Sequence, residues 1–394
     1  MKFLFFANRV PYPPYRGDKL KIYNLAKRLS KKHELHLLTF AQTKEDLRYK
    51  AELEKIFTKV HFVYLPKWRS AINCLAAVWD DTPLQVLYFR SAAMSNKLAE
   101  VLQNDKFDAI HVQHLRMSPY LADNKTIASI LDMPDAFSLY WKRRMKAQKN
   151  PFLRIFETIE QKRVLKYERI MHKYNMSLVC STEDLDYLKE QHNIEHIYLL
   201  PNGVDLDTFK AGGHDYSHNH TLLFTGNMDY APNVDAVQYF VQDILPLIKQ
   251  QHPQVKFIIA GQRPIKKVLD LASSTVQVTG FIKDLATVYN EASVVVAPLR
   301  FGAGTQNKVL EAMAMGVPVV CSNIGYKGLG IQSGQGAIMQ TDAQAFANSV
   351  IALLNNQSLR EATGKQGIDV IHNRFGWDSV ATTLEKYLIA ISNQ

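Results

Sequence analysis

Short apolar runs alternate with amphipathic segments along almost the whole chain of 394 residues. The runs at 2–7 and 33–40 are typical of buried strands, and helical spacing at 19–29 separates them. This alternation predicts an α/β fold built from two doubly wound parallel sheets, each a Rossmann-like domain. Further strands are expected at 60–65, 107–113, 127–131, 176–180, 197–200, 222–225, 255–260, 276–279, 294–296 and 317–321.

The helices predicted between these strands complete the pattern. They are expected at 44–57, 95–103, 185–192, 235–249, 284–292, 343–354, 358–372 and 377–392. A capping signal, Ser181 followed by Glu183 and Asp184, precedes the helix at 185–192. A Pro-Asn-Gly-Val-Asp turn at 201–205 ends the first half. We therefore expect an N-terminal domain over 1–200 and a C-terminal domain over 201–375.

The stretch at 294–322 carries the strongest functional signal. A short β-branched strand leads into a loop with Gly302 and Gly304, and a helix follows. Free N–H groups at such a helix start, together with the macrodipole, favour an anion. Lys308 in the first turn adds a positive charge, and Glu311 lies on the same side, where a carboxylate can accept hydrogen bonds from a ribose. These residues predict a site for a nucleoside diphosphate.

This glycine loop matches neither of two common nucleotide motifs. It has no Gly-Lys-Ser/Thr of a Walker A loop, and Asn307 stands where the dinucleotide fingerprint has its third glycine. The absent fingerprint speaks against an NAD-dependent oxidoreductase, a reading that failure to bind NAD would exclude. An ordinary βαβ unit with an exposed Lys–Glu pair remains the structural alternative to a ligand site.

The pattern GxGTxxKxLEAMAxGxPVV at 302–320 resembles the donor-binding signature of retaining glycosyltransferases of family 4. The chain is most similar to sugar transferases of exopolysaccharide gene clusters. The resemblance implies the two-domain GT-B fold, with domains facing a cleft and a helix at 376–394 crossing back to the first domain. It also implies that Glu311 holds the donor ribose, while the loop amides at Gly302, Ala303, Gly304 and Thr305 hold diphosphate and sugar.

Two departures from the family pattern concern the donor site. The family usually has a second glutamate eight positions before the first, and Ala303 stands there. Many members place an Arg and a Lys after the glycine that matches Gly226, whereas this chain has Asn227 and Asn233. Gly226 and Asn227 are themselves expected to contact the donor, as is Gly261. Lys308 and Arg300 are therefore expected to carry more of the diphosphate binding. The resemblance further implies that the loops at Gly261 and at Phe281 and Ile282 flank the base.

The first strand is followed by a loop that ends in Arg16, Gly17 and Asp18. In the family this loop usually has two adjacent glycines and lies against the donor phosphates or the acceptor. Arg16 is expected to assist Lys308 in catalysis, and Gly17 and Asp18 to contact the donor. The Arg-Gly-Asp tripeptide also matches an adhesion motif, which would need secretion, and the apolar run at the N-terminus ends too early for a signal peptide.

Candidate acceptor residues follow two strands of the first half. His111 and His114 lie near the end of the strand at 107–113, and core packing or surface exposure is the alternative for both. Asp132 stands where the family usually has a histidine near the donor sugar. Asp132, as a catalytic candidate, and Asp135 are predicted to handle the acceptor hydroxyl or to contact the sugar. A turn or helix N-cap pair is the competing explanation.

Charge is concentrated in one segment. The net charge is +10, and residues 140–175 contain 11 Lys or Arg against three Glu. Apolar residues interleave with these charges at helical spacing, which predicts a basic amphipathic helix on an anionic membrane surface, suited to a lipid-linked acceptor. A solvated helix face is the alternative. No nucleic-acid-binding motif occurs, so nucleic acid is not expected as a partner.

From the remaining composition we expect a protein of the cytoplasm, and the basic segment predicts a peripheral position on the inner face of the membrane. Three widely spaced cysteines, Cys74, Cys180 and Cys321, suggest reduced thiols, and no run approaches 18 apolar residues. We expect no cofactor and no metal, because neither a metal-ligand spacing nor an Asp-x-Asp motif is evident. The function expected is transfer of a sugar from a nucleotide sugar to a glycan or lipid-linked glycan with retention. A non-catalytic sugar-nucleotide-binding or membrane-docking protein is the alternative.

Overall fold

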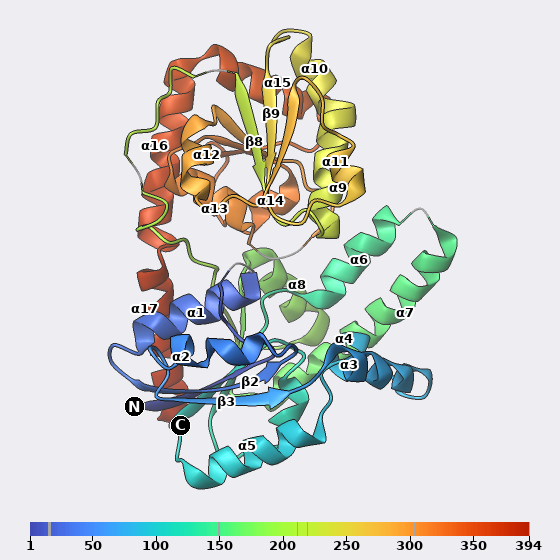
Figure 1. Ribbon diagram of the computed structural model, residues 1–394, viewed down its shortest axis with the longest axis vertical. Coiled ribbons are helices and arrows are strands. Elements are labelled where there is room, and N and C mark those ends of the chain that lie inside the picture. Colours follow the sequence, from blue (N-terminus) through green and yellow to red (C-terminus); the bar gives the residue numbers. More distant parts are fainter. Residues whose placement is uncertain (15–16, 149, 211, 219, 303–304, 394) are drawn as a thin grey trace. The chain divides into compact units, whose positions relative to one another are not determined.

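The computed structural model describes residues 1–14, 17–148, 150–210, 212–218, 220–302 and 305–393 (Figure 1). The chain forms two compact units, Met1–Pro201 with Val380–Gln394, and Asn202–Ser379. The first division lies one residue after the domain boundary expected from the sequence. The last helix, α17 (Trp377–Ser392), begins in unit 2 and ends in unit 1. No helix in the described ranges is long and apolar enough to cross a membrane.

Unit 1 contains a seven-stranded parallel sheet with the order β3-β2-β1-β4-β5-β6-β7. The order reverses between β1 and β4, which is the place where open α/β sheets bind ligands beyond the carboxyl ends of their strands. Figure 1 shows helix α5 on one side of this sheet and α1 and α2 on the other. The strands are β1 (Lys2–Ala7), β2 (Glu34–Ala41), β3 (Lys59–Tyr64), β4 (Ala109–Gln113), β5 (Ser129–Asp132), β6 (Met176–Val179) and β7 (Ile197–Leu199).

The helices of unit 1 agree with the predicted pattern except between 44 and 87 and between 137 and 167, where two helices form in place of one basic amphipathic helix. The expected helix at 44–57 forms only a 3₁₀ turn (Asp46–Tyr49) and one turn of α-helix, because Leu53 is the only residue of these two elements that is buried. Two further short helices, α3 and α4, were not predicted. The helices are α1 (Gly17–Leu29), α2 (Lys50–Leu53), α3 (Lys67–Asn73), α4 (Leu84–Leu87), α5 (Ala92–Asn104), α6 (Phe137–Ala147), α7 (Pro151–Tyr167) and α8 (Thr182–His192), with 3₁₀ turns at Cys74–Val78, Ser118–Tyr120 and Glu168–Lys173.

Unit 2 contains a six-stranded parallel sheet with the order β10-β9-β8-β11-β12-β13. Strands buried on both faces read as continuous apolar runs, and Val294, Val295 and Val296 of β11 are fully buried. The short last strand was not predicted because it lies in a glycine-rich stretch. The strands are β8 (Thr221–Thr225), β9 (Lys256–Ala260), β10 (Val276–Gly280), β11 (Val294–Ala297), β12 (Val319–Cys321) and β13 (Ala337–Met339).

The helix expected at 235–249 is longer and interrupted. It begins at Ala231, and a π-helical turn at Phe240–Ile244 divides it into α9 and α10. Pro246 explains the interruption, since proline has no N–H to donate to the preceding turn. The helices of unit 2 are α9 (Ala231–Tyr239), α10 (Leu245–Lys249), α11 (Lys266–Leu269), α12 (Leu285–Glu291), α13 (Asn307–Ala314), α14 (Asn323–Lys327), α15 (Ala343–Asn355) and α16 (Gln357–Arg374).

Candidate functional site

Helix α13 positions the two side chains that the sequence singles out in unit 2. Its first residue, Asn307, follows the glycine loop after β11. The helix ends at Ala314, and Gly316, two residues further on, has a φ of +77°, a left-handed conformation that glycine adopts without strain. The Gly316 N–H donates to the Met313 carbonyl and the Val317 N–H to the Ala312 carbonyl, which closes the helix. Gly302 and Thr305 lie in the described part of the loop, whereas Ala303 and Gly304 lie outside the described residues.

Lys308 is buried in the first turn of α13. Its ammonium group donates to the side-chain oxygen of Asn233 at 3.2 Å and lies 5.1 Å from the centre of the Phe224 ring. Burial lowers the pKa of Lys308 to about 8, against a smaller opposing effect of the Glu311 carboxylate. A cation that is buried and only partly compensated will gain from an anionic ligand, because the ligand restores the charge balance lost on burial.

Glu311 is held by a tyrosine that the sequence did not point to. The Tyr289 hydroxyl, on α12, donates to Glu311 Oε2 at 2.8 Å and lies 2.7 Å from the hydroxyl of Thr225 at the end of β8. Burial raises the pKa of Glu311, while this hydrogen bond and Lys308 act in the opposite direction. Tyr289 is fully buried among apolar residues, so its spacing in the sequence is that of an ordinary core residue. The structure alone identifies it as the group that orients Glu311.

A hydrogen-bond network beside Lys308 contains Asn227 and Asn233, the two asparagines that this chain has where many family members have an Arg and a Lys. Asn233 binds Lys308 through its oxygen and donates through its nitrogen to the Asn227 carbonyl at 3.0 Å. A Cβ at Gly261 would lie 1.6 Å from the Gly226 carbonyl oxygen, so only glycine lets these two loops approach. Gly226 itself leaves room for Asn233, because a Cβ there would lie 2.6 Å from the Asn233 amide nitrogen. The glycines therefore serve packing between the loops in addition to any ligand contact.

Arg300 already has partners in unit 2. Its Nε donates to the Asp235 carboxylate at 2.8 Å, and its guanidinium lies 4.8 Å from the centre of the Tyr239 ring. The hydrogen bonds with Asp235 raise the pKa of Arg300. A diphosphate contact by Arg300 stays a prediction and would require exchange of the Asp235 partner. Phe281, 58% exposed, and the half-buried Ile282 follow β10, as expected for side chains that could stack on a base.

The loop after β1 is described only in part. Arg16 lies outside the described residues, so its catalytic role stays a prediction. Gly17 begins α1, and the Asp18 carboxylate lies 3.5 Å from the guanidinium of Arg9. The Asp18 carbonyl accepts a hydrogen bond of 2.6 Å from the Gln113 side chain at the end of β4. These contacts fix the start of α1 at the carboxyl edge of the sheet.

Asp132 is not open to a substrate in the way the sequence suggested. It is 1% exposed and forms a buried ion pair with Lys21, at 2.8 Å, and a contact of 3.1 Å with His111 Nε2. Burial would raise the pKa of Asp132, but Lys21 and His111 outweigh it and lower that pKa. His111 is fully buried on β4 and packs on the Phe5 ring, which corresponds to the core alternative for this residue. Neither side chain lies on the surface of unit 1. The prediction that Asp132 and His111 contact an acceptor is therefore revised, and both have a structural position behind the edge of the sheet.

His114 is also buried but lies at the edge of the sheet. It has a φ of +79°, is 4% exposed and stacks on the Phe137 ring at 4.6 Å. Burial, with Arg116 and Arg9 nearby, lowers the pKa of His114 well below its usual range. The imidazole is therefore neutral at pH 7, and a role as an acid is not supported by its surroundings.

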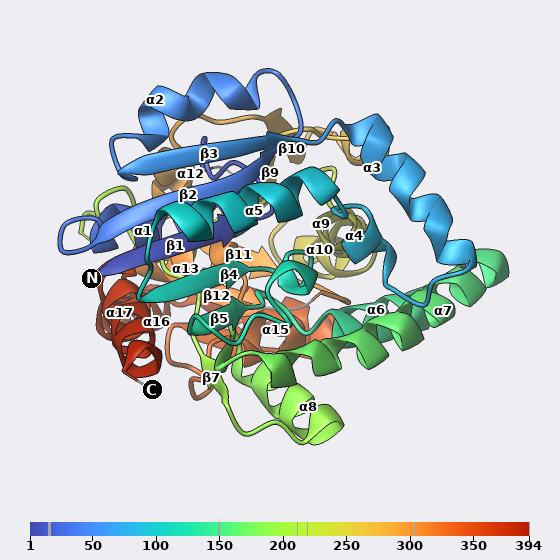
Figure 2. The ribbon, with the colours of Figure 1, turned by 90° about the horizontal axis from the view of Figure 1, so that it is seen from below.

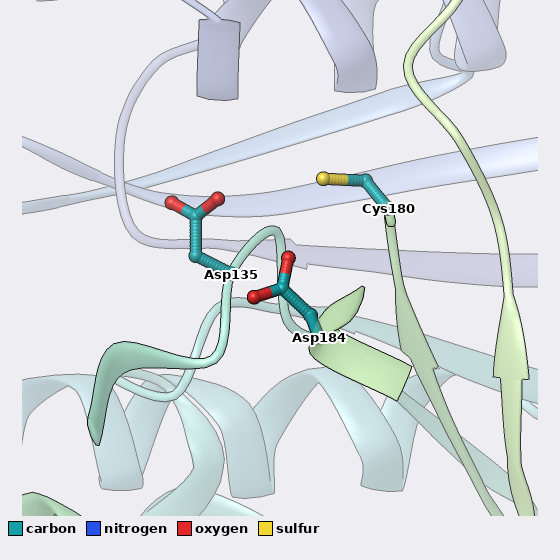
Figure 3. Close-up of side chains that lie close together, drawn as sticks. All are labelled: Asp135, Cys180 and Asp184. Atoms are coloured by element: carbon teal, nitrogen blue, oxygen red, sulfur yellow. The ribbon is translucent and has the colours of Figure 1, made fainter. Parts of the chain in front are cut away.

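Asp135 belongs to a cluster that the sequence did not predict (Figure 3). Its carboxylate, the Cys180 thiol and the Asp184 carboxylate offer ligand atoms within 4.8 Å of one another, an arrangement that could hold a metal ion. Asp184, however, accepts hydrogen bonds from the Ser181 hydroxyl and the Ala136 N–H, as part of the predicted cap of α8. Burial and the Asp184 charge raise the pKa of Asp135 to about 7. The cluster therefore holds a carboxyl that can exchange a proton near neutral pH.

Comparisons with known proteins match both halves of the chain. Residues 22–208 match the family model described as Glycosyltransferase Family 4, and residues 219–356 match the model described as Glycosyl transferases group 1. An uncharacterised 44.6 kDa protein in the cps region of Klebsiella pneumoniae is 25% identical over 378 residues, which are 91% of this chain and 92% of that protein. Phosphatidyl-myo-inositol mannosyltransferase of Mycobacterium tuberculosis is 29% identical over 199 residues, 47% of this chain and 52% of that protein.

Solved structures share the whole fold at low identity. Sucrose-phosphate synthase from Thermosynechococcus elongatus has a TM-score of 0.74 at 14% identity and covers 99% of both chains. Anabaena HepE, solved in complex with UDP and glucose, has a TM-score of 0.70 at 15% identity, over 99% of this chain and 100% of that one. At these identities the likeness concerns the fold alone, and it agrees with the two parallel-sheet units described above.

Proposed function

The chain belongs to the family 4 glycosyltransferases of GT-B fold, and from this premise we propose that it transfers a sugar from a nucleotide-diphosphate donor to a hydroxyl acceptor with retention of configuration. The observation that carries the proposal is the pair Lys308 and Glu311 on α13, one a buried ammonium short of negative charge and the other a carboxylate oriented by Tyr289. The cps-region and mannosyltransferase relatives support a place in polysaccharide or glycolipid synthesis.

In the proposed complex, unit 2 binds the donor. The backbone N–H groups of the glycine loop and of the N-terminus of α13 would donate hydrogen bonds to the diphosphate, and Lys308 would neutralise one of its charges. Glu311 would accept hydrogen bonds from the ribose, because Tyr289 already holds one of its oxygens in place. Phe281 and Ile282 would flank the base. HepE, a neighbour in fold, was solved with UDP, which supports a uridine nucleotide as the first donor to test.

The departing diphosphate determines what the site must stabilise. When the bond between the anomeric carbon and the diphosphate breaks, negative charge grows on the leaving oxygen, and Lys308 with the α13 amides would stabilise that charge in the transition state. The proposed reaction uses no metal, so chelation by EDTA should leave turnover unchanged. Arg16 would add a second positive charge from the loop after β1.

Unit 1 is proposed to bind the acceptor. Asp135 is the candidate for contact with the acceptor hydroxyl, because it follows β5 at the carboxyl edge of the sheet and burial raises its pKa to about 7. An acceptor carried on a lipid would be reached at a membrane surface, so we also propose that residues 140–175 contact an anionic membrane from the cytoplasmic side.

Thermal unfolding with a panel of nucleotides tests the donor site. UDP, GDP, ADP, CMP, their common sugar conjugates and NAD would each be added at saturation, and a ligand at 100 times its Kd stabilises by about 2.7 kcal/mol. A shift with one nucleoside diphosphate, absent in Lys308→Ala, is the expected result. If the protein is folded but no nucleotide of the panel raises its unfolding temperature, the proposal is contradicted and a non-catalytic protein is favoured. The replacement of a family glutamate by Ala303 is the sequence feature that agrees with this alternative.

A further inference from the structure

Unit 1 exposes large apolar side chains on two helical segments that lie far apart in the sequence. Trp79 is 87% exposed and Phe152 is 80% exposed. Single exposed apolar residues are common, but a group of this size marks an interaction surface. The exposed apolar residues, called here the apolar face, are Trp68, Ile72, Leu75, Val78 and Trp79 of segment 67–79, and Phe152, Leu153, Ile155, Phe156 and Ile159 of α7.

Helix α7 is turned opposite to the usual orientation of an amphipathic helix. In its first ten residues it buries Glu157 and Glu160, each 1% exposed, while its phenylalanines and isoleucines face outward. Glu157 accepts a hydrogen bond of 2.8 Å from Arg144 on α6, and Glu160 accepts one of 2.8 Å from the Leu84 N–H. Because the buried carboxylates need these partners, the helix cannot rotate to hide its apolar side chains without leaving charges unpaired.

The two segments meet in the folded unit. The Arg163 guanidinium donates to the Ala77 carbonyl at 2.6 Å, and Lys166 lies 3.1 Å from the Asp81 carboxylate. Figure 2 shows the chain after α3 running close to α7, as these contacts require. The apolar residues of both segments therefore belong to one region of unit 1, and segment 67–79 adds two tryptophans that the sequence pattern of 140–175 did not include.

The segments that carry the apolar face have an excess of positive charge. All three glutamates of residues 140–175 are buried, including Glu168 at 0% exposure, whereas the same stretch of the sequence contains 11 Lys and Arg. Segment 67–79 contains no Asp or Glu and contributes Lys67 and Arg69, both exposed. The acidic residues that follow this segment in the sequence, Asp80 and Asp81, are paired with Arg90 and Lys166.

We propose that the apolar face docks unit 1 on an anionic lipid bilayer, with the side chains of both segments entering the headgroup region and the basic residues contacting lipid phosphates. Aromatic residues favour this depth of a bilayer, and clustered Lys and Arg favour anionic lipid. A second copy of the chain is disfavoured as the occupant, because like-charged borders would be brought together. The inference deepens the membrane contact proposed above and rests on that part of the proposed function.

Vesicle sedimentation with the full chain tests the docking. Vesicles of equal parts phosphatidylcholine and phosphatidylglycerol should bind the protein, whereas vesicles of phosphatidylcholine alone should bind it weakly. The triple variant Trp79→Ser, Phe152→Ser, Phe156→Ser should lose at least about tenfold in binding, because three large apolar surfaces no longer leave water. The matched control is Leu269→Ser with Leu359→Ser, two exposed leucines of unit 2, 49% and 38% exposed, whose replacement should change nothing.

Two other outcomes would overturn the proposal. Equal binding by the triple variant would show that the positive charge alone holds the protein on vesicles. Sedimentation velocity that finds a dimer in the parent and a monomer in the triple variant would assign the apolar face to a second copy instead. Nucleotide-induced thermal stabilisation is measured on the parent and on the same variants. A parent protein that is stabilised by nucleotide but does not bind the anionic vesicles would reject the docking while leaving the donor site intact.

Discussion

At the scale of single residues, burial decides how the charged groups of this protein can act. Burial shifts the pKa of three of these groups: it lowers the pKa of Lys308 and raises the pKa of Glu311 and of Asp135. Such shifts are characteristic of groups that bind charge or move protons. The ion pair of Lys21 with Asp132 shows the opposite case, since two buried charges satisfy each other and leave nothing for a ligand.

Lys308 should make donor affinity depend on pH. With a pKa of about 8 in the free protein, the ammonium is charged below pH 8 and neutral above it, and only the charged form attracts a diphosphate. The Kd for the nucleoside diphosphate should therefore rise as pH increases through about 8, measured by calorimetry. Lys308→Ala should remove this dependence and lower kcat by roughly 100- to 1,000-fold. Lys267→Ala, on the exposed side of α11, is the control; a pH dependence that survives in Lys308→Ala would assign it to another group.

Tyr289 should act on binding through Glu311. Tyr289→Phe removes the hydrogen bond to the carboxylate and leaves the ring in place, so donor affinity should fall by a few-fold to about tenfold, the equivalent of one hydrogen bond. Glu311→Ala should weaken binding further. If Tyr289 orients Glu311, the double variant should be no weaker than Glu311→Ala, whereas additive losses would indicate separate roles. Isothermal titration with the nucleotide identified by the panel measures all three.

Asp135→Asn should stabilise the protein at high pH. The pKa of Asp135 in the folded state, about 7, lies above its value in the unfolded state. Between about pH 4 and pH 7 the carboxyl therefore keeps its proton in the folded state but has lost it in the unfolded state. The stability of the folded state consequently falls as pH rises through this window. Denaturant unfolding at pH 8 should therefore favour the variant over the parent, with a difference that shrinks toward pH 4. A constant difference at both pH values would contradict the assignment.

At the scale of elements, close approach of backbone decides which loops can form the donor site. The loops after β8 and β9 touch at Gly226 and Gly261, where a side chain has no room. Both glycines were predicted to contact the ligand. In the structure, the close packing of the two loops requires glycine at both positions, whether or not a ligand is bound. The helical spacing of α7 was predicted from the sequence, but its orientation was not. The orientation depends on hydrogen bonds between the buried glutamates of α7 and groups outside this helix.

Gly261→Ala tests the packing between these loops. The added Cβ would lie 1.6 Å from the Gly226 oxygen, so the backbone must move, and we expect a loss of several kcal/mol, at the upper end of single substitutions. Gly17→Ala is the control, since nothing lies within 4 Å of a Cβ there and residue 17 begins a helix. Thermal unfolding of both variants should show a large drop in Tm for the first and little change for the second; equal effects would refute the steric argument.

At the scale of the whole molecule, the chain consists of two units that are joined twice. The polypeptide passes from unit 1 to unit 2 after Pro201 and returns within α17, at Val380. Leu384 and Leu388 of α17 are fully buried in unit 1, and the Tyr387 hydroxyl donates to the Leu199 carbonyl there. The last helix is therefore part of the core of the first unit.

Leu388→Ala should destabilise unit 1 selectively. Removal of a buried leucine side chain costs about 2–5 kcal/mol, so backbone amides of unit 1 should exchange faster with solvent than in the parent. Val350→Ala, in the core of unit 2, is the reciprocal variant and should accelerate exchange mainly there. Hydrogen exchange measured by mass spectrometry separates the two, and faster exchange of unit 2 alone in Leu388→Ala would contradict the division.

The sequence by itself determined the periodic pattern, the two parallel sheets, the boundary near residue 200 and the donor motif on α13, because apolar spacing, glycines and caps act locally. It could not reveal Tyr289 beneath Glu311, the ion pair that removes Asp132 and His111 from the surface, or the cluster of Asp135, Cys180 and Asp184. Only the tertiary structure decided these, since each depends on contacts between residues on different elements. The same reason applies to the apolar face, where buried carboxylates turn α7 outward beside a segment some 80 positions away.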